Sequence, residues 1–272
     1  MTVVVKLGGA RAVDPSGALA DVGDLDEVVV VHGGSTAVDD LLERLDIEPT
    51  YVETPDGVVG RFTDEETMEA FTMAMAGSVN TALVAGLQNE GVDAVGLSGV
   101  DGKLMTGPRK SAVRVVEDGT KKIKRGDHSG AVRAVNDDLL ESLLDDGHVP
   151  VTGPPMLGDD DGEWVPVNAD ADRAAAAVAG ALAGTLVVLT DVPGLLRDVD
   201  DPNTVVDRVD SPAALDEARD LAEGFMGKKV MAAVEALEGG ADRVVVADAN
   251  AEQPIHAALD GAGTTFTPDC LQ

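Results

Sequence analysis

Two valine runs that each end in a glycine pair constrain the fold of this chain most. Residues 3–9 read Val-Val-Val-Lys-Leu-Gly-Gly, and residues 28–34 read Val-Val-Val-Val-His-Gly-Gly. An unbroken apolar run of this length is typical of a strand buried on both faces, as in a parallel sheet covered by helices. We therefore expect two neighbouring strands whose carboxyl ends present glycine loops side by side.

Both glycine pairs suit a bound anion. A loop without side chains allows backbone N–H groups to approach an anion closely, and Lys6 adds a full positive charge beside the first loop. A tight turn without a ligand fits Gly8-Gly9 equally well when that segment is taken alone. His32 is interpreted as structural, because it ends a strand and no second histidine lies nearby to share a metal.

The rest of the chain continues to alternate between strand and helix patterns. The second strand is expected to span residues 25–31, and further strands are expected at residues 94–99 (with a turn), 148–152, 186–189 and 243–246. Helices are expected at residues 37–45, with Ser35 or Thr36 as its N-terminal cap, and at 64–90, 136–145, 174–183 and 225–237. This alternation predicts an α/β protein, a three-layer α-β-α sandwich with a mainly parallel central sheet. Neither GxxxxGK[ST] nor a strand-borne GxGxxG occurs, which excludes a P-loop enzyme and a Rossmann dehydrogenase.

The chain is strongly acidic, with 50 Asp and Glu against 20 Lys and Arg and a net charge of -30. Its acidic residues are interleaved with regular apolar periodicity, so we expect a folded protein with an acidic surface and not a disordered chain. Such a surface is typical of a halophile-like source with a salt-loaded cytoplasm. It also argues against nucleic acid as a partner.

Export and membrane signals are not expected. Lys6 interrupts the only early apolar run, which excludes a signal peptide. Residues 174–189 form the longest weakly polar stretch by this reading, shorter than the ~20 residues of a membrane span, and are interpreted as a buried helix followed by a buried strand. The single Cys270 excludes internal disulfides. We therefore expect a cytoplasmic protein without a membrane partner.

Basic residues gather in one segment. Eight of the 20 lysines and arginines lie at residues 103–125, where only Glu117 and Asp118 are acidic. Residues 113–124 are predicted to form a hairpin that turns at 118–119. A solvated hairpin is one interpretation. An acidic ligand or partner is favoured, because an isolated basic cluster on so acidic a chain attracts negative charge.

Two charged residues stand near expected helix starts. Arg61 precedes the helix at 64–90, which Thr63 or Asp64 is expected to cap. A guanidinium holds a carboxylate through two hydrogen bonds, although a solvated surface arginine fits this position equally well. Asp172 lies in the first turn of the alanine-rich helix, where the helix dipole stabilises a carboxylate and where it could also orient lysines.

Six motifs in order resemble the amino acid kinase family over essentially the whole chain. They are VVVKLGGA, VVHGGS, GRFTD, NADADRAAAA, VVLTDVPGLL and MGKKV. Within the family, the chain is most similar to acetylglutamate kinases. It is nearer still to the branch that acts on glutamate or 2-aminoadipate attached to an acidic amino-group carrier protein. The GRFTD segment, the basic hairpin and the sequence Asp-Ala-Asp-Arg at 170–173 support that branch.

The resemblance implies a role for each matching residue. Lys6 would stabilise the phosphoryl group in transfer, Lys229 would hold the ATP phosphates, and Asp172 would orient both lysines. Residues implied on the substrate side are Gly33, Gly34, Arg61 and Asn168. Residues implied at the phosphates and ATP are Gly8, Gly9, Thr190, Asp191, Gly194, Met226 and Lys228. Two choices stay open: Lys228 competes with Lys229, and Asp170 offers an alternative alignment to Asp172.

The implied reaction transfers the γ-phosphate of ATP to a side-chain carboxylate, with Mg²⁺. This reaction brings anions together, so positioning and charge neutralisation suffice and no general base is needed. The resemblance further implies one domain, with residues 1–183 binding the amino-acid substrate and forming a homodimer and residues 184–272 binding ATP. No side-chain metal site is expected. Free N-acetylglutamate as substrate, or a binding protein without turnover, are the alternatives.

Overall fold

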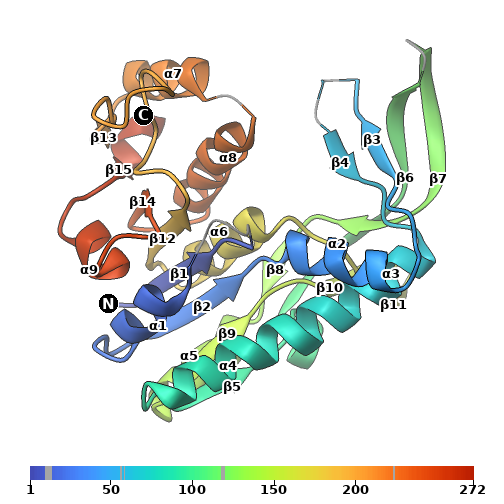
Figure 1. The fold of residues 1–272 in the computed structure, drawn as a ribbon, viewed down its shortest axis with the longest axis horizontal. Helices are drawn as coiled ribbons and strands as arrows, with labels where there is room; N and C mark the ends of the chain where they lie inside the picture. Colours follow the sequence, from blue (N-terminus) through green and yellow to red (C-terminus); the bar gives the residue numbers. More distant parts are fainter. Residues whose placement is uncertain (10–13, 56, 58, 118–119, 223) are drawn as a thin grey trace.

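The computed structural model describes residues 1–9, 14–55, 57, 59–117, 120–222 and 224–272. In this part of the chain a central sheet lies between two layers of helices, and two hairpins extend from one end (Figure 1). The expected three-layer α-β-α sandwich is confirmed. The expected turn at 118–119 lies outside the described residues.

The central sheet has eight strands in the order β13-β15-β14-β12-β1-β2-β9-β5. Their bounds are β1 (Val3–Leu7), β2 (Val28–His32), β5 (Ala94–Gly96), β9 (Val149–Thr152), β12 (Thr185–Thr190), β13 (Arg208–Val209), β14 (Arg243–Asp248) and β15 (Thr264–Phe266). All neighbouring pairs are parallel except β14 and β15. The carboxyl ends of β1, β2 and β12 therefore meet at one edge of the sheet, directly before both glycine pairs.

Each face of the sheet has its own helical layer. The helices that pack on one face are α5 (Asp137–Asp145), α6 (Ala171–Ala181), α7 (Pro212–Leu221) and α8 (Phe225–Glu238). Those on the other face are α1 (Ser16–Val22), α4 (Asn80–Asn89) and α9 (Pro254–Leu259). A third apolar cluster joins α2 (Ser35–Arg44) to α3 (Glu65–Thr72).

The valine runs supply both faces of this core. Successive side chains of a strand point to opposite faces, so Val4 packs with α6 and α8 while Val3 and Val5 pack with α1 and α9. All three valines are at most 4% exposed. Lys6 follows Val4 by two residues, so the same alternation directs Lys6 to the α6 and α8 face.

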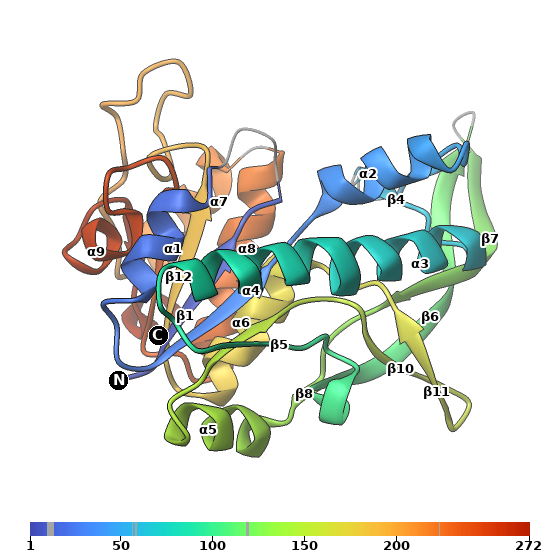
Figure 2. The same cartoon turned by 60° about the horizontal axis from the view of Figure 1, so that its bottom comes forward.

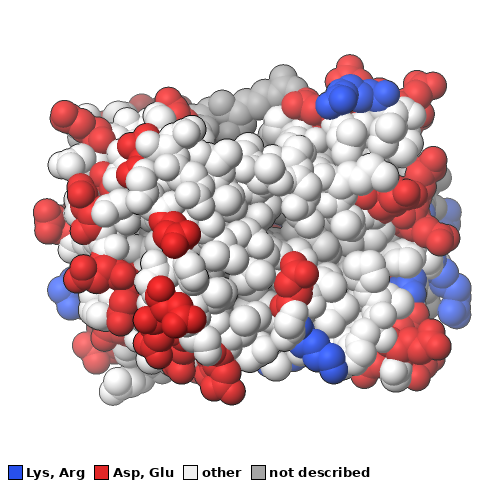
Figure 3. Space-filling view, turned by 90° about the horizontal axis from the view of Figure 1, so that it is seen from below, with Lys and Arg blue, Asp and Glu red and all other residues white. Residues whose placement is uncertain are grey.

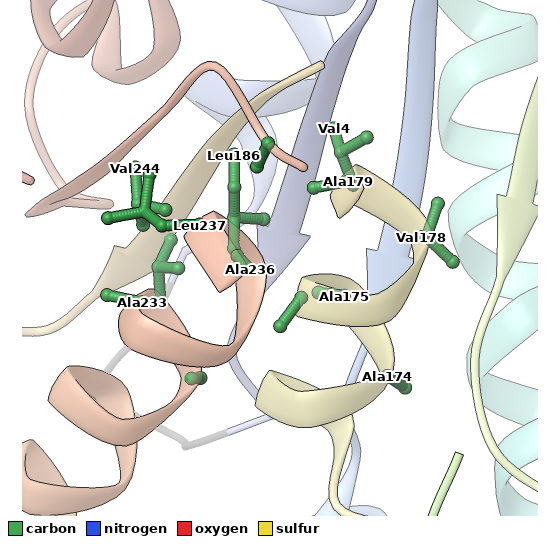
Figure 4. Close-up of a cluster of buried hydrophobic side chains, with 14 of the residues drawn as sticks. Val4, Ala174, Ala175, Val178, Ala179, Leu186, Ala233, Ala236, Leu237 and Val244 are labelled. Atoms are coloured by element: carbon green, nitrogen blue, oxygen red, sulfur yellow. The ribbon is translucent and has the colours of Figure 1, made fainter. Parts of the chain in front are cut away.

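Small side chains allow α6 and α8 to lie close together. Figure 4 shows Ala175 of α6 on the side of Ala236 of α8, and Ala179 of α6 beside Val4 of β1. A Cβ atom at Gly180 would lie 2.9 Å from the Gly239 carbonyl oxygen, so α6 and the end of α8 meet backbone to backbone. This packing is what allows side chains at the starts of the two helices to reach one another.

The two projecting hairpins lie side by side at one end of the molecule (Figure 1). One consists of β6 (Met105–Glu117) and β7 (Thr120–Gly130), which confirms the expected basic hairpin. The other consists of β3 (Tyr51–Glu53) and β4 (Val59–Arg61). The strands β8 (Ala134–Val135), β10 (Met156–Asp160) and β11 (Glu163–Val167) extend the first into a smaller sheet. The sequence patterns did not predict β3, β4, β10 or β11.

Four expectations about helices and strands have different outcomes. The Asp64 cap is confirmed, since its carboxylate accepts from the Thr67 N–H at 2.9 Å. The prediction that a side chain caps α2 is wrong, because Gly34 occupies the N-cap position and no side-chain cap bond forms. The expected last strand is followed by β15, which pairs with it in the antiparallel direction. The helix expected at 64–90 contains a π-helical segment, η1 (Met73–Val79), between α3 and α4.

The helix Glu65–Asn89 is apolar and long enough to cross a membrane by length and composition alone, and 33% of its most apolar window is buried. No charged residue lies between Glu69 and Glu90, so this run, and not residues 174–189, is the longest uncharged stretch. Figure 2 shows the helix crossing one side of the molecule, and Figure 3 shows an uncharged expanse on that side with acidic groups around it. The interpretation of 174–189 as a helix followed by a strand is confirmed by α6 and β12.

Candidate active site

Three charged side chains meet at the carboxyl edge of the sheet. The Lys6 ammonium lies 2.5 Å from Asp172 Oδ1, and the Lys229 ammonium lies 3.4 Å from Asp172 Oδ2. Lys6 comes from β1, Asp172 from the first turn of α6, and Lys229 from α8. The contact that the family resemblance implied between Asp172 and both lysines is therefore present. Asp170 makes a different contact: it caps α6 by accepting from the N–H groups of Asp172 and Arg173.

Burial and charge act in opposite directions on Asp172. Its side chain is 10% exposed, and those of Lys6 and Lys229 are 8% and 12% exposed. Burial raises the pKa of Asp172, but the charges and hydrogen bonds of Lys6 and Lys229 outweigh it and hold the pKa below its ordinary value of 3.8. One carboxylate with two ammonium groups leaves a local charge of +1, and this residual charge suits an anionic ligand.

The two glycine loops touch one another beside this cluster. A Cβ atom at Gly9 would lie 2.3 Å from the Gly34 nitrogen, and one at Gly33 would lie 3.5 Å from the Gly9 nitrogen and 3.5 Å from the Ala171 Cβ. The second loop therefore also contacts the start of α6. Because the N-terminus of a helix has partial positive charge, the starts of α6 and α2 reinforce the attraction for an anion.

Arg61 is neither solvated nor free. Its side chain is 9% exposed and forms an ion pair with Asp39 of α2. The same guanidinium lies 3.3 Å from the Ser35 carbonyl oxygen and 5.8 Å from the Tyr51 ring centre. Its Nε–H is buried and has no partner within the described part of the chain. Arg61 thus lies at the start of α2, next to the second glycine loop, with one donor unused.

Asn168 is hydrogen-bonded to Thr63, which lies two residues after Arg61. Its amide donates to the Thr63 hydroxyl at 3.1 Å, while the Thr63 N–H donates to the Asp127 carboxylate at 3.1 Å. The His128 N–H donates to the Thr63 carbonyl at 2.6 Å. These bonds tie the end of β11, the strand β7 and the turn before α3 to one another.

The residues implied on the ATP side follow β12 or belong to α8. Thr190 is the last residue of β12, is 7% exposed, and its hydroxyl lies 3.2 Å from the Asp191 carboxylate. Gly194 has φ of 154°, and a Cβ there would lie 2.7 Å from the Thr264 hydroxyl. Met226 and Lys228 also lie on α8, three residues and one residue before Lys229. Lys229 contacts Asp172 from α8.

Several polar residues near the site escaped sequence reasoning. They are Asp39, Asn80 and Asp127. A partner for Arg61 could have been sought in the helix after the second glycine pair, but many acidic residues compete in so acidic a chain. Among the described residues, no group of three His, Cys, Asp or Glu side chains could hold a metal ion.

Comparison with known proteins places these features in a family. The model of the amino acid kinase family matches residues 1–248. The "[LysW]-aminoadipate kinase" of Deinococcus radiodurans is 43% identical over 97% of this chain and 91% of its own length. The protein of the same name from Thermus thermophilus is 43% identical over 96% of this chain and 98% of its own. An acetylglutamate kinase of Methanopyrus kandleri is 42% identical over 96% and 98%.

Solved structures agree on the fold. An N-acetylglutamate synthase from Neisseria gonorrhoeae, complexed with coenzyme A and N-acetyl-glutamate, superposes with a TM-score of 0.74 at 27% identity, over 98% of this chain and 59% of the synthase chain. The carbamate kinase of Giardia lamblia bound to AMP-PNP superposes with a TM-score of 0.69 at 15% identity, over 98% of each chain. The chain belongs to the amino acid kinase family.

Proposed function

We propose that this chain is an ATP-dependent kinase in arginine or lysine biosynthesis. Its substrate is glutamate or 2-aminoadipate whose amino group is attached to a carrier protein, and its product is the side-chain acyl phosphate. The observation that supports this best is the buried pair of lysines on Asp172, beside two touching glycine loops. The 43% identical relatives named [LysW]-aminoadipate kinase support the carrier-linked substrate.

In the proposed reaction, a substrate carboxylate oxygen attacks the γ-phosphorus of ATP. The bond between that phosphorus and the β–γ bridging oxygen breaks, and ADP leaves. The carboxylate is already ionised, so no side chain has to take a proton. Lys6 neutralises charge on the phosphoryl group and Lys229 neutralises charge on the leaving phosphates, while Asp172 fixes both ammonium groups.

The substrate and the nucleotide approach from opposite sides in this proposal. Residues 1–183 bind the amino-acid substrate, with Gly33, Gly34, Arg61 and Asn168 around it. Residues 184–272 bind ATP, with Thr190, Asp191, Gly194, Met226 and Lys228 around it, and Gly8 and Gly9 meet the phosphates. Mg²⁺ would be bound with the ATP phosphates and would neutralise part of their charge.

Trapping the acyl phosphate as a hydroxamate tests the function. The protein is incubated with Mg-ATP, hydroxylamine and one acceptor: carrier-linked glutamate, carrier-linked 2-aminoadipate or free N-acetylglutamate. We expect a higher kcat/KM for a carrier-linked acceptor. Equal or better use of N-acetylglutamate would instead favour an acetylglutamate kinase, in line with the 42% identical relative of that name. ATP binding without any hydroxamate formation would indicate a binding protein without turnover.

The basic hairpin is the proposed docking surface for the acidic carrier, and its two faces differ. Cross-strand pairs share a face. Arg114 lies opposite Ile123, Ala112 opposite Arg125 and Val116 opposite Lys121, and these six residues are the outer face. The inner face contains Val115, which is buried, and Lys124, whose ammonium lies 4.4 Å from the Phe62 ring centre. The outer face is therefore the face available to a large partner.

Reversing the three outer charges is expected to weaken use of the carrier. The variant Arg114→Glu, Lys121→Glu, Arg125→Glu should lower kcat/KM for carrier-linked glutamate about 10–100-fold at low salt, because attraction becomes repulsion during encounter. Its kcat/KM for N-acetylglutamate should stay unchanged. The control variant reverses three exposed arginines at the other end of the molecule, Arg197, Arg208 and Arg219, with the same change in net charge. Equal loss for both substrates in the hairpin variant would contradict docking there.

The uncharged helix face supports a homodimer. Exposed positions along Glu65–Asn89 include Met73, which is 50% exposed, and Gly77, Thr81 and Ala85. On a chain of net charge -30, a second copy needs a surface without like charges, and this face provides one. We expect sedimentation equilibrium to give about twice the 27.8 kDa chain mass. The variant Met73→Glu, Ala85→Glu should shift the protein toward monomer.

Leu45→Glu serves as the control for dimer dissociation, because Leu45 is 47% exposed but lies at the end of α2. A monomeric wild-type chain would contradict the dimer. Sedimentation of the wild type with lipid vesicles would point instead to a membrane role for the same helix.

The acidic surface supports a working environment of high salt inside the cell. The thermal midpoint is expected to rise steadily from low to molar KCl, because the Debye length falls to about 3 Å at 1 M and self-repulsion is screened. Choline chloride at equal ionic strength should give the same rise if screening is the cause. A midpoint that does not move with salt would show that the surface charge places no strain on the fold.

A further inference from the structure

His32 and Asn80 form a buried polar pair directly behind the second glycine loop. His32 is the last residue of β2 and is 1% exposed; Asn80 follows the π-helical segment and is 5% exposed. The Asn80 amide nitrogen lies 3.1 Å from His32 Nε2, and also 2.9 Å from the Val151 carbonyl oxygen and 3.2 Å from that of Leu97. The residue roles of the proposed reaction use neither side chain.

The hydrogen bonds fix which ring nitrogen of His32 bears the proton. Nδ1 lies 3.2 Å from the Gly33 carbonyl oxygen, which can only accept, so Nδ1 must donate. Nε2 is then an acceptor, and the Asn80 amide shares its two N–H groups among Nε2 and the carbonyl oxygens of Leu97 and Val151. Burial lowers the pKa of His32 to about 4, against the opposing effect of the Gly33 bond, so the ring is neutral at working pH.

This bond orients one peptide group of the loop. The Gly33 carbonyl and the Gly34 N–H belong to the same trans peptide, so they point in opposite directions. The Gly33 N–H is already used, because it donates to the Leu7 carbonyl at 3.0 Å. The Gly34 N–H has no acceptor within the described residues. Holding the Gly33 oxygen therefore aims a free donor away from His32.

Close contacts surround both the loop and the polar pair. A Cβ at Gly34 would lie 2.6 Å from Met75 Sδ, so the π-helical segment presses on the loop from one side. A Cβ at Gly153 would lie 2.7 Å from the His32 carbonyl oxygen, and one at Gly96 would lie 2.2 Å from Asn80 Oδ1. A Cβ at Gly9 would cover the Gly34 nitrogen at 2.3 Å. Only glycine at position 9 leaves that donor open.

We propose that His32 and Asn80 are positioning residues, which lock the Gly33–Gly34 peptide so that the Gly34 N–H points at the phosphoryl group between the two glycine loops. The role rests on the proposed kinase function for the identity of that anion. A donor aimed in advance at developing charge lowers the barrier to reaction, and a displacement of about 1 Å can lower the rate about 100-fold.

Two variants separate positioning from packing. In His32→Asn, the carboxamide N–H takes a place close to that of Nδ1 and can still donate to the Gly33 oxygen. In His32→Leu, a side chain of similar size has no donor. We expect His32→Leu to lower kcat at least about tenfold with KM for ATP nearly unchanged, and His32→Asn to recover most of the loss. Wild-type kcat in His32→Leu, or equal losses in both variants at equal thermal stability, would overturn the proposal.

A measurement on the wild-type chain tests the same claim without relying on a variant that folds. Nitrogen-15 NMR of the His32 ring is expected to show the Nδ1–H tautomer from pH 6 to 9, and the Gly34 amide resonance should shift when AMP-PNP and N-acetylglutamate are added. An Nε2–H tautomer, or a Gly34 amide that does not respond, would overturn the proposal. Absence of hydroxamate with every acceptor would defeat the proposed function instead, and would leave the tautomer result valid.

Discussion

Replacing Lys6 with methionine is expected to lower kcat about 10²–10³-fold, because the change removes a preorganised charge aimed at the transferred phosphoryl group. Methionine nearly preserves the volume of the lysine stem, which matters because Lys6 is 6% exposed within β1. Lys229→Met should lower kcat by a similar factor. It should also raise KM for ATP more than Lys6→Met does, since Lys229 faces the nucleotide side in the proposed reaction. Hydroxamate formation under saturating substrates gives kcat directly.

The comparison variants make this result specific. Arg208→Met removes one exposed positive charge that lies far from the cluster and is paired with Asp210, so it should retain wild-type kcat. Lys228→Met tests the neighbouring lysine, and we expect a smaller loss than for Lys229→Met, because Lys229 has the contact to Asp172. Turnover near the wild-type rate in Lys6→Met would remove the central support for the proposed chemistry.

Of the long-range contacts at this site, the sequence predicts only those that a periodic pattern determines. The valine runs determine strand burial on both faces, and the period of two then places Lys6 on the α6 and α8 side. The alanine-rich segment of α6 predicts a helix, and its close approach to α8 brings Asp172 to Lys229. The contact between the two lysines and Asp172 itself came from the family resemblance, since nothing local in the sequence joins positions 6, 172 and 229.

Other features depend on tertiary packing without a periodic signal. Met73–Val79 has the composition of an ordinary helix, and its π-helical form arises where Met75 and Val79 pack against Gly34. The ion pair of Arg61 with Asp39 joins two segments whose spacing no motif fixes. The three-residue strands β3 and β4 are too short and too polar for alternation to reveal them. The π-helical segment and Arg61 both contact residues of the second glycine loop or the helix start directly after it.

Asp172→Asn is expected to destabilise the fold by about 3–5 kcal/mol near neutral pH, because the substitution leaves two nearly buried ammonium groups without a counter-charge. Removing one of those charges should offset the loss. In a double-mutant cycle, Asp172→Asn combined with Lys6→Met should therefore be more stable than Asp172→Asn alone. Urea unfolding of the four proteins, followed by circular dichroism, measures the coupling. A cycle without coupling would mean that the three groups do not interact in solution.

The pH dependence of this loss follows from the direction of the pKa shift. The pKa of Asp172 is lower in the folded chain than its ordinary value of 3.8, so its contribution is fully present above that value and disappears as the pH falls through the folded pKa. The stability difference between wild type and Asp172→Asn should thus be constant from pH 5 to 8 and shrink below about pH 4. ATP should also narrow the difference at neutral pH, because its phosphates supply the missing negative charge beside Lys6 and Lys229. An anion site at these lysines requires that narrowing; a difference that ATP does not change would place the phosphates elsewhere.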